Sequence, residues 1–265
     1  MFPKKYFRKI AIFSVVLMLL IVGTFYLRAS NYSVYASNLI WDKTHIPLIS
    51  TFISPQNTNL NFEIGNYYFG GGAYDLKKAE KYYRKILEVN PLFPLAHYQI
   101  ARIEFVAGNL YYALDEINKE IEINPDFKRS YYVRGLINGY NGDLKNAASD
   151  FKEFLKWKKE SWAGWNDLSW VYFTEGDYKN AKYAAIQGLV YFPQNPWLLN
   201  SYGVALINLG EKDKAREVLI KAKEILSNMT ENDWGVAYPG NNPDVYKNGF
   251  ESMKNSVEKN LKLTE

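Results

Sequence analysis

Hydrophobic and polar residues follow three different patterns along the chain. An uncharged run of 18 residues, Ile10–Leu27, consists mainly of Ile, Val, Leu, Met and Phe. From residue 58 to residue 227, apolar positions recur at helical spacing and the whole pattern repeats. Residues 245–262 are amphipathic at the same spacing. The sequence therefore predicts an all-helical protein with one hydrophobic N-terminal segment and one additional helix after the repeated region.

Small residues mark the repeat. One set recurs every 34 residues without exception: Ala79, Ala113, Ala147, Ala181 and Ala215. A second set does the same: Gly108, Gly142, Gly176 and Gly210. A third set has a single interval of 36: Gly65, Ala101, Gly135, Ser169 and Gly203. Because antiparallel helices that cross at close range need small side chains, each period of 34 residues predicts one pair of helices.

Other positions of the repeat predict where these helices end. Each glycine of the second set can adopt the left-handed conformation that stops a helix. The next residue, Asn109, Asp143, Asp177 or Glu211, suits the start of the following helix. Pro91, Pro125 and Pro193 close three of the repeats, because proline cannot continue a helix. Large residues four positions after the alanine are expected in the core: Tyr83, Ile117, Phe151 and Leu219.

This pattern resembles the tetratricopeptide repeat (TPR). Five repeats are expected at 58–91, 92–125, 126–159, 160–193 and 194–227. Three positions depart from the family pattern: Lys159 and Ser227 replace the closing proline, and Glu120 stands where a small residue is usual. The resemblance implies an all-α helix-turn-helix solenoid, which residues 245–262 would cap at its C-terminal end.

The N-terminal run is long enough to cross a membrane. Eighteen residues in a helix rise about 27 Å, close to the hydrocarbon thickness of a bilayer. Residues 1–9 carry four basic side chains, whereas only Arg28 follows the run, which orients the N-terminus toward the cytoplasm. We therefore expect a single-pass signal anchor at 10–27 with the repeats outside the cytoplasm. A cleaved signal peptide and a secreted chain are the alternative.

Two segments flank the repeats. Residues 28–57 form a juxtamembrane connector whose Ile46, Leu48 and Phe52 are too apolar for a free linker, so that they are expected to pack on the first repeat or lie on lipid. Residues 228–244, with Trp234 and Tyr238, are predicted as a loop before the capping helix.

Charge and composition exclude several classes of function. The formal net charge is +4, but residues 1–30 contribute five basic residues and no acidic one, which leaves 27 basic and 28 acidic residues elsewhere. No clustered basic face for nucleic acid is expected. The chain has no cysteine, and its two histidines, His45 and His97, lie in different segments. No metal, cofactor or catalytic residue is predicted, and an enzyme is disfavoured.

The family resemblance implies that ligands bind in a concave groove lined by the first helix of each repeat. The groove positions are rich in aromatic residues, Asn and Arg, which are residue types that anchor interfaces. The residues that correspond to them are Phe62, Asn66, Phe69, Tyr98, Arg102, Phe105, Arg129, Tyr132, Leu136, Asn166, Trp170, Phe173, Trp197, Asn200 and Val204. Any one of these aromatic residues could instead pack inside its repeat.

One known groove chemistry of the family is incomplete here. Some members hold the C-terminal carboxylate of a partner with Lys, Asn and Arg. Asn66 and Arg129 are compatible with that role, but Phe62 and Val133 stand at the other two positions. A chaperone-tail docking role is therefore not expected.

The leading hypothesis from sequence is a membrane-anchored, extracytoplasmic adaptor. Its groove would bind a protein or peptide, for example in envelope, secretion or pilus-type assembly. Two alternatives remain: a structural subunit of a membrane complex that uses the convex face or residues 228–244, and a hydrolytic or glycan-processing enzyme dependent on Asp233 or Asp244. The sequence does not predict the oligomeric state.

Overall fold

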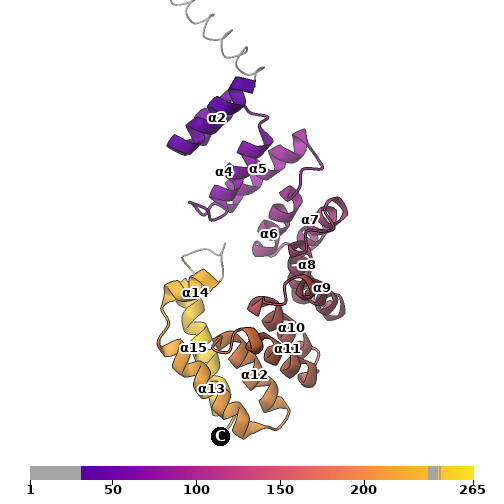
Figure 1. Cartoon of the computed structure of the whole chain (residues 1–265), viewed down its shortest axis with the longest axis vertical. Coiled ribbons are helices and arrows are strands. Elements are labelled where there is room, and N and C mark those ends of the chain that lie inside the picture. The colour runs from indigo at the N-terminus through magenta and orange to yellow at the C-terminus, as the bar shows by residue number, and fades with distance from the viewer. Residues whose placement is uncertain (1–30, 238–243, 245) are drawn as a thin grey trace, which may run out of the picture. The chain divides into compact units, whose positions relative to one another are not determined.

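The computed structural model describes residues 31–237, Asp244 and residues 246–265. The expected transmembrane segment, 10–27, and the basic flank, 1–9, lie outside the described residues. Within them the chain forms fourteen α-helices and no β-strand longer than an isolated bridge between Phe69 and Tyr74. The all-α solenoid expected from the sequence is therefore confirmed for this part of the chain (Figure 1).

The helices follow one another in pairs. Two precede the repeats: α2 (Asn31–Thr44) and α3 (Pro47–Ile53). The first helices of the five repeats are α4 (Thr58–Tyr68), α6 (Ala96–Val106), α8 (Arg129–Tyr140), α10 (Trp162–Thr174) and α12 (Pro196–Asn208). The second helices are α5 (Leu76–Val89), α7 (Leu110–Ile123), α9 (Leu144–Trp157), α11 (Tyr178–Tyr191) and α13 (Lys212–Ser227). Two more follow: α14 (Glu231–Ala237) and α15 (Tyr246–Lys262).

The described chain divides into two compact bodies. The N-terminal body comprises the described residues up to Tyr68 together with Lys77–Phe93, and the C-terminal body comprises Phe69–Leu76 together with Pro94–Glu265. The C-terminal body contains four complete helix pairs and the two helices that follow them.

Glycine lets the two helices of a repeat approach closely. A Cβ added at Gly135 would lie 2.9 Å from the Phe151 ring, and one at Gly203 would lie 2.6 Å from Cγ of Leu219. Both large side chains are fully buried, as expected from their spacing after the repeated alanines. At the equivalent position of the fourth repeat, the Ser169 hydroxyl donates to the carbonyl of Ala181 at 2.9 Å. The periodic small residues therefore lie where the two helices of each repeat cross at close range.

The expected left-handed helix ends are present in four repeats. Gly108, Gly142, Gly176 and Gly210 have φ values between 78° and 85°. In each case the amide after the glycine bonds a carbonyl in the last turn of the helix, for example Asp143 N to Asn138 O at 2.9 Å. This is the bonding pattern that satisfies carbonyls at a helix terminus.

Only two of the four residues after these glycines cap the next helix with a side chain. The carboxylates of Asp143 and Asp177 accept from backbone amides three residues later. Asn109 and Glu211 also stand at the position that begins the next helix, as expected, but their side chains make no such bond. Asn109 instead donates to Glu104 at 2.8 Å, and Glu211 pairs with Lys182 and Lys214.

Tight turns join successive repeats where proline is present. The amide of Phe127 donates to Asn124 O across Pro125, and the amide of Asn195 donates to Phe192 O across Pro193. At the third joint, which lacks proline, the Trp165 indole donates to the carbonyl of Lys159 at 2.8 Å. A side chain thus holds the turn that proline stiffens elsewhere.

The segment after the fifth repeat differs from the expected loop. Residues Glu231–Ala237 form helix α14, which Thr230 and Asp233 begin with reciprocal hydrogen bonds. A Cβ at Gly249 of α15 would overlap the Trp234 ring, so that α14 and α15 cross closely. The composition of 228–244 suggested a loop because a helix of seven residues is too short to show periodicity.

Helix α15 covers the end of the solenoid. Phe250 and Val257 are buried in one cluster with Leu219, Ala222 and Leu226 of α13. Figure 1 shows α15 running beside α13. The apolar face of the last repeat is therefore shielded from water by the helix at the position expected for a cap.

None of the helices described here combines the length and the apolar character needed to cross a bilayer.

Candidate functional site

Three first helices of the C-terminal body carry a row of aromatic rings. The Phe105 ring of α6 contacts the Tyr140 ring of α8 edge-on, with centroids 5.4 Å apart. Tyr140 in turn lies 5.2 Å from the Trp170 ring of α10. We call Phe105, Tyr140 and Trp170 the aromatic row. Because Tyr140 is 64% exposed and the other two rings are only partly buried, the row presents apolar surface to solvent.

Sequence analysis did not identify Tyr140. It lies four residues after Leu136, on the same face of α8, and this spacing is the signal that points to it. Trp170 packs closely over the backbone of Gly139, where an added Cβ would be 2.6 Å from the indole. Gly139 therefore lets the Trp170 ring lie against α8.

A ladder of hydrogen bonds connects the same set of first helices. The Tyr132 hydroxyl of α8 donates to Asp167 of α10 at 2.7 Å, and Asn166 donates to the same carboxylate at 3.3 Å. The Ser201 hydroxyl of α12 donates to Asn166 Oδ1 at 2.9 Å. We call Tyr132, Asp167, Asn166 and Ser201 the polar ladder. It brings together two predicted residues, Tyr132 and Asn166, with two that were not predicted.

Asp167 is the group of the polar ladder with a strongly shifted pKa. Desolvation between the helices raises its pKa from 3.8 to about 6, against the opposing hydrogen bonds from Tyr132 and Asn166. No basic side chain is among the causes of the shift. A carboxylate in this setting favours a donor or a cation from a ligand.

Arg102 lies between two aromatic rings at the other end of this face. Its guanidinium carbon is 4.4 Å from the Phe69 centroid and 5.6 Å from the Tyr98 centroid. Burial raises the pKa of Tyr98, while Arg102 and Arg129 oppose the shift. Arg129 itself is exposed at the start of α8. The α6–α8 part of the face therefore carries positive charge close to aromatic surface.

Two predicted residues of the fifth repeat are already engaged within the protein. Trp197 is buried and its ring lies 5.0 Å from that of Trp162. Asn200 Oδ1 accepts from Asn260 of α15 at 2.9 Å. Trp197 thus packs on a neighbouring repeat, and Asn200 bonds the helix expected as the cap, so neither side chain is directed only toward a ligand.

The remaining predicted residues have mixed surroundings. Phe173 packs on Tyr178 within its own repeat, and Leu136 packs on the core of the third and fourth repeats. Val204 is partly buried. In the N-terminal body the Phe62 ring contacts Tyr83 and Phe93, and Asn66 accepts from the Tyr83 hydroxyl at 2.8 Å.

The carboxylate clamp remains incomplete in three dimensions. Val133 is 5% exposed and belongs to the core, and Phe62 packs against other rings. Neither position presents a basic group to a C-terminal carboxylate.

A cluster of buried charges lies between α6 and α7. His97 Nδ1 is 2.6 Å from Glu116, whose pKa is lowered because hydrogen bonds from His97 and Lys119 outweigh the opposing effect of burial. Glu120 is fully buried and accepts from the amides of Leu95 and Tyr98. Burial raises the Glu120 pKa, and the two amides oppose the shift. These contacts fix the start of α6, which explains the departure from a small residue at position 120.

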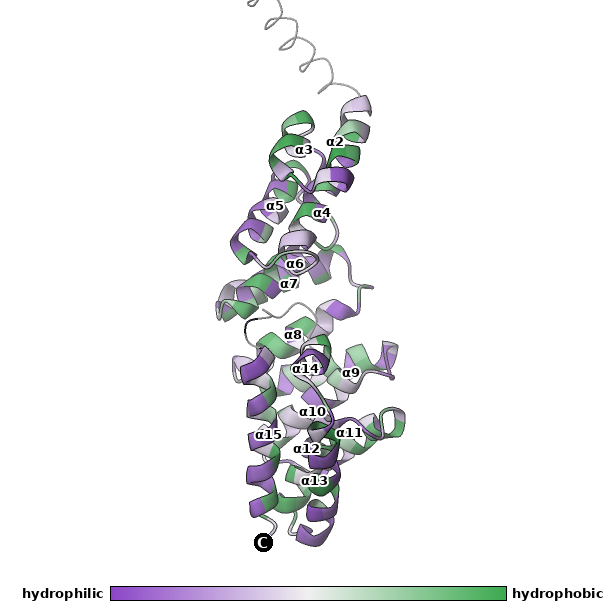
Figure 2. Cartoon of the chain, turned by 90° about the vertical axis from the view of Figure 1, so that its left-hand side faces the viewer, coloured by the Kyte–Doolittle hydropathy of each residue, from purple (hydrophilic) through white to green (hydrophobic). Residues whose placement is uncertain are grey.

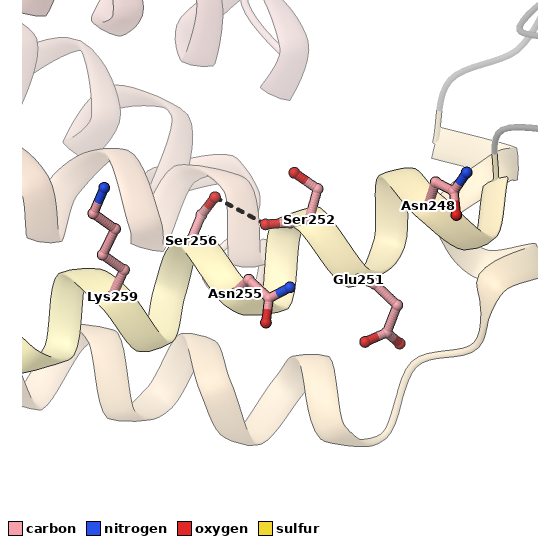
Figure 3. A pocket seen from close by; sticks show the side chains of 6 residues that line it. All are labelled: Asn248, Glu251, Ser252, Asn255, Ser256 and Lys259. Carbon is pink, nitrogen blue, oxygen red and sulfur yellow. Dashed lines mark hydrogen bonds between the residues drawn. The ribbon is translucent and has the colours of Figure 1, made fainter.

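Metal ligation is not evident in the described part of the chain, and two pockets in it are surface depressions. It contains no group of three or more His, Cys, Asp or Glu side chains placed to hold a metal ion. A depression of about 380 Å³ is lined by α15 alone (Figure 3), and its residues are Asn248, Glu251, Ser252, Asn255, Ser256 and Lys259. A second, of about 290 Å³, lies between α13 and α15. Both are open surface features, so the first-helix face of the C-terminal body is the better candidate site.

Comparison with known proteins agrees with this architecture. Residues 128–161 and 198–225 match the family model "Tetratricopeptide repeat". A TPR repeat-containing protein of Methanocaldococcus jannaschii, MJ0941, is 27% identical over 106 residues, which are 40% of this chain. The match spans only 28% of the length of that relative.

Solved structures show the same fold at low sequence identity. A crystal structure of MamA protein superposes with a TM-score of 0.58 and 20% identity, over 65% of this chain and 93% of that one. YrrB, described as a TPR protein with an unusual peptide-binding site, superposes with a TM-score of 0.57 and 16% identity, over 68% of this chain and 92% of that one. Residues 128–161 and 198–225 thus match the tetratricopeptide repeat, and the described helices have the fold of tetratricopeptide-repeat proteins.

Proposed function

We propose that this protein is a membrane-anchored scaffold that binds an extended segment of a partner protein on the first-helix face of its C-terminal body. The observation that carries the proposal is the aromatic row, which exposes three contacting rings from three successive first helices. Rigid aromatic side chains supply large contact area at low entropic cost, and they anchor interfaces. YrrB, which shares the fold and has a peptide-binding site, supports the same kind of ligand.

The polar ladder supports an extended peptide as the ligand. Extended segments present unpaired amides and carbonyls, which need partners from the protein. Asn166 and Asp167 are partly buried beside the aromatic row on α10 and carry amide and carboxylate groups. Arg129 adds an exposed positive charge on α8. We therefore expect a ligand with apolar side chains, at least one acidic group near Arg129, and backbone donors near Asp167.

The N-terminal run supports the membrane part of the proposal. Ile10–Leu27 is uncharged and long enough to span a bilayer, and the basic residues before it favour a cytoplasmic N-terminus. In this arrangement the repeats lie outside the cytoplasm. We infer a role in holding partner chains at the membrane surface, as in envelope or secretion assemblies.

A peptide selection tests the binding face. A random dodecapeptide library is panned on the full chain in detergent micelles, and the affinity of enriched peptides is measured by fluorescence polarisation. We expect Tyr140→Ala to weaken binding at least tenfold and Arg129→Glu to weaken binding of acidic peptides. Peptides that bind both variants as tightly as the unaltered chain would rule out this face.

The matched control is Tyr111→Ala. Tyr111 is 80% exposed on α7, a second helix, where its ring contacts that of Tyr112. This pair favours the alternative function, a structural subunit that docks through its second helices. Loss of binding in Tyr111→Ala with retention in Tyr140→Ala would support that alternative and exclude the proposed face.

A further inference from the structure

In α2 and α3, the first two described helices, serine side chains are buried and several large apolar side chains are exposed. In α2 the side chains that face the protein are two serines followed by one tryptophan: Ser33 and Ser37 are at most 1% exposed, and Trp41 is 5% exposed and packs on Leu60 and Ile64 of α4. Tyr32, Tyr35 and Leu39 point to the opposite side and are 77%, 69% and 44% exposed. They are spaced three and four residues apart, so they form one stripe of the helix. Before Trp41, the inward side of α2 is therefore polar and its outward side apolar, whereas a helix on a soluble protein normally shows the reverse distribution.

Helix α3 repeats this inversion. Ser50 is fully buried, whereas Leu48, Ile49 and Phe52 are 78%, 48% and 56% exposed. Figure 2 shows that hydrophobic residues make up much of α3 and part of α2. We call Tyr32, Tyr35, Leu39, Leu48, Ile49 and Phe52 the outer apolar face.

Hydrogen bonds hold the polar residues inward. The Ser37 hydroxyl donates to Val34 O at 2.8 Å and accepts from Asn57 at 3.3 Å. Asn57 also donates to Asn38 at 2.9 Å and accepts from the amide of Leu60 at the start of α4. The Ser50 hydroxyl donates to Ile46 O at 3.0 Å. Because Asn57 joins Ser37 and Asn38 of α2 to the start of α4, the outward residues of α2 cannot turn inward without breaking these bonds. The Ser50 bond is local to α3 and satisfies its buried hydroxyl.

We propose that the outer apolar face lies in the interfacial layer of the lipid bilayer. The inference rests on the proposed membrane attachment and adds a second contact with lipid. Only residues 28–30 separate the hydrophobic run from α2, and three residues span at most about 11 Å, so the start of α2 lies close to the end of the run.

The chemistry of the face fits that layer. Tyrosine is enriched where lipid headgroups meet the acyl chains, and its hydroxyl stays in the hydrated zone. Lys43 lies one turn after Leu39 on α2, so that its ammonium can reach lipid phosphates while its stem follows the apolar stripe. The chain connection through residues 28–30 places this face next to the proposed membrane span, where a soluble partner would have to compete with lipid. The bilayer accounts both for the exposed apolar side chains and for their position beside the hydrophobic run.

Because the chain has no cysteine, a single introduced cysteine can be labelled selectively. Single cysteines replace Leu48 or Phe52 in the full chain and carry an environment-sensitive nitrobenzoxadiazole label after reconstitution in phosphatidylcholine–phosphatidylglycerol vesicles. Leu20→Cys in the hydrophobic run is the positive control, and Glu217→Cys, exposed on α13, is the negative control. Quenching is measured with lipids that are spin-labelled near the headgroup.

We expect labels at positions 48 and 52 to lose at least half of their emission to the spin-labelled lipids, whereas the label at 217 is unaffected. If the labels at 48 and 52 remain accessible to aqueous iodide while the label at 20 is quenched by lipid, the inference is overturned and the anchor stands. If the label at 20 also stays in water, both fail. Emission shifted to shorter wavelength without quenching by lipid would mean that protein, either a partner or a second copy, covers the face, which also overturns the inference.

Discussion

At the scale of single residues, the most informative positions are those where polar groups are buried. Asp167 would be solvated on an isolated helix, but packing of α8 against α10 desolvates it and raises its pKa to about 6. Glu120 is buried and accepts from two backbone amides at the start of α6. One of these amides belongs to Leu95, whose φ is 71°. In both cases the neighbouring helix decides the environment of the carboxylate.

The raised pKa makes stability depend on pH. In the folded chain Asp167 holds its proton up to about pH 6, whereas the unfolded chain releases it near 3.8, so the contribution of Asp167 to folding is fully present below pH 3.8 and is lost as pH rises through 6. Asp167→Asn keeps an acceptor for Tyr132 and removes the charge.

We expect Asp167→Asn to be more stable than the unaltered chain at pH 7 by about 2 kcal/mol and no more stable at pH 4. Urea unfolding followed by circular dichroism at the two pH values measures this difference. An equal difference at both pH values would show that the carboxylate is solvated.

At the scale of helix pairs, glycine acts in two separate ways. At Gly203 the requirement is space, since an added Cβ would lie 2.6 Å from Leu219 Cγ. At Gly210 the requirement is conformation, since its φ is 78° and no atom beyond its two chain neighbours lies within 4 Å of an added Cβ. The two positions belong to the same repeat, so that they can be compared directly.

Replacement of each glycine by alanine separates the two effects. Gly203→Ala should lower the free energy of unfolding by about 2 kcal/mol through overpacking against a fully buried leucine. Gly210→Ala should cost about 1 kcal/mol through backbone strain alone. Thermal unfolding of both variants tests the order, and a larger loss at Gly210 would contradict the close crossing of α12 and α13.

At the scale of the whole molecule, stability is built from contacts between neighbouring repeats. Separate clusters of buried residues lie between the second and third repeats, between the third and fourth, and around α13 and α15. In a solenoid each repeat is stabilised by its own packing and by its neighbours, so a defect at one end should stay local. Helix α15 is the element that protects the last repeat.

Phe250→Ala tests this local organisation. Phe250 is 3% exposed in the cluster with Leu219 and Leu226, so its truncation should cost about 3 kcal/mol. Native-state hydrogen exchange should become faster in α13 and α15 and remain unchanged in α8 and α9. Faster exchange throughout would show that the C-terminal body unfolds as one cooperative unit.

The sequence by itself determined the helix pairs, because a 34-residue spacing of Ala and Gly has one structural cause, the close crossing of two helices. The burial of Tyr83, Phe151 and Leu219 followed from that spacing. Likewise, the left-handed helix ends followed from glycine, which is the residue that adopts positive φ at little cost.

Only the tertiary structure decided which residues of the first helices remain accessible. Trp197 and Tyr140 are both aromatic at helical spacing, yet one is buried and the other is 64% exposed. The difference comes from neighbours distant in sequence, such as Trp162, and no local pattern encodes them. The local pattern of α2 did not reveal its rotation for the same reason: hydrogen bonds from Asn57, about twenty residues away in the chain, hold Ser37 inward and leave Tyr32, Tyr35 and Leu39 outside.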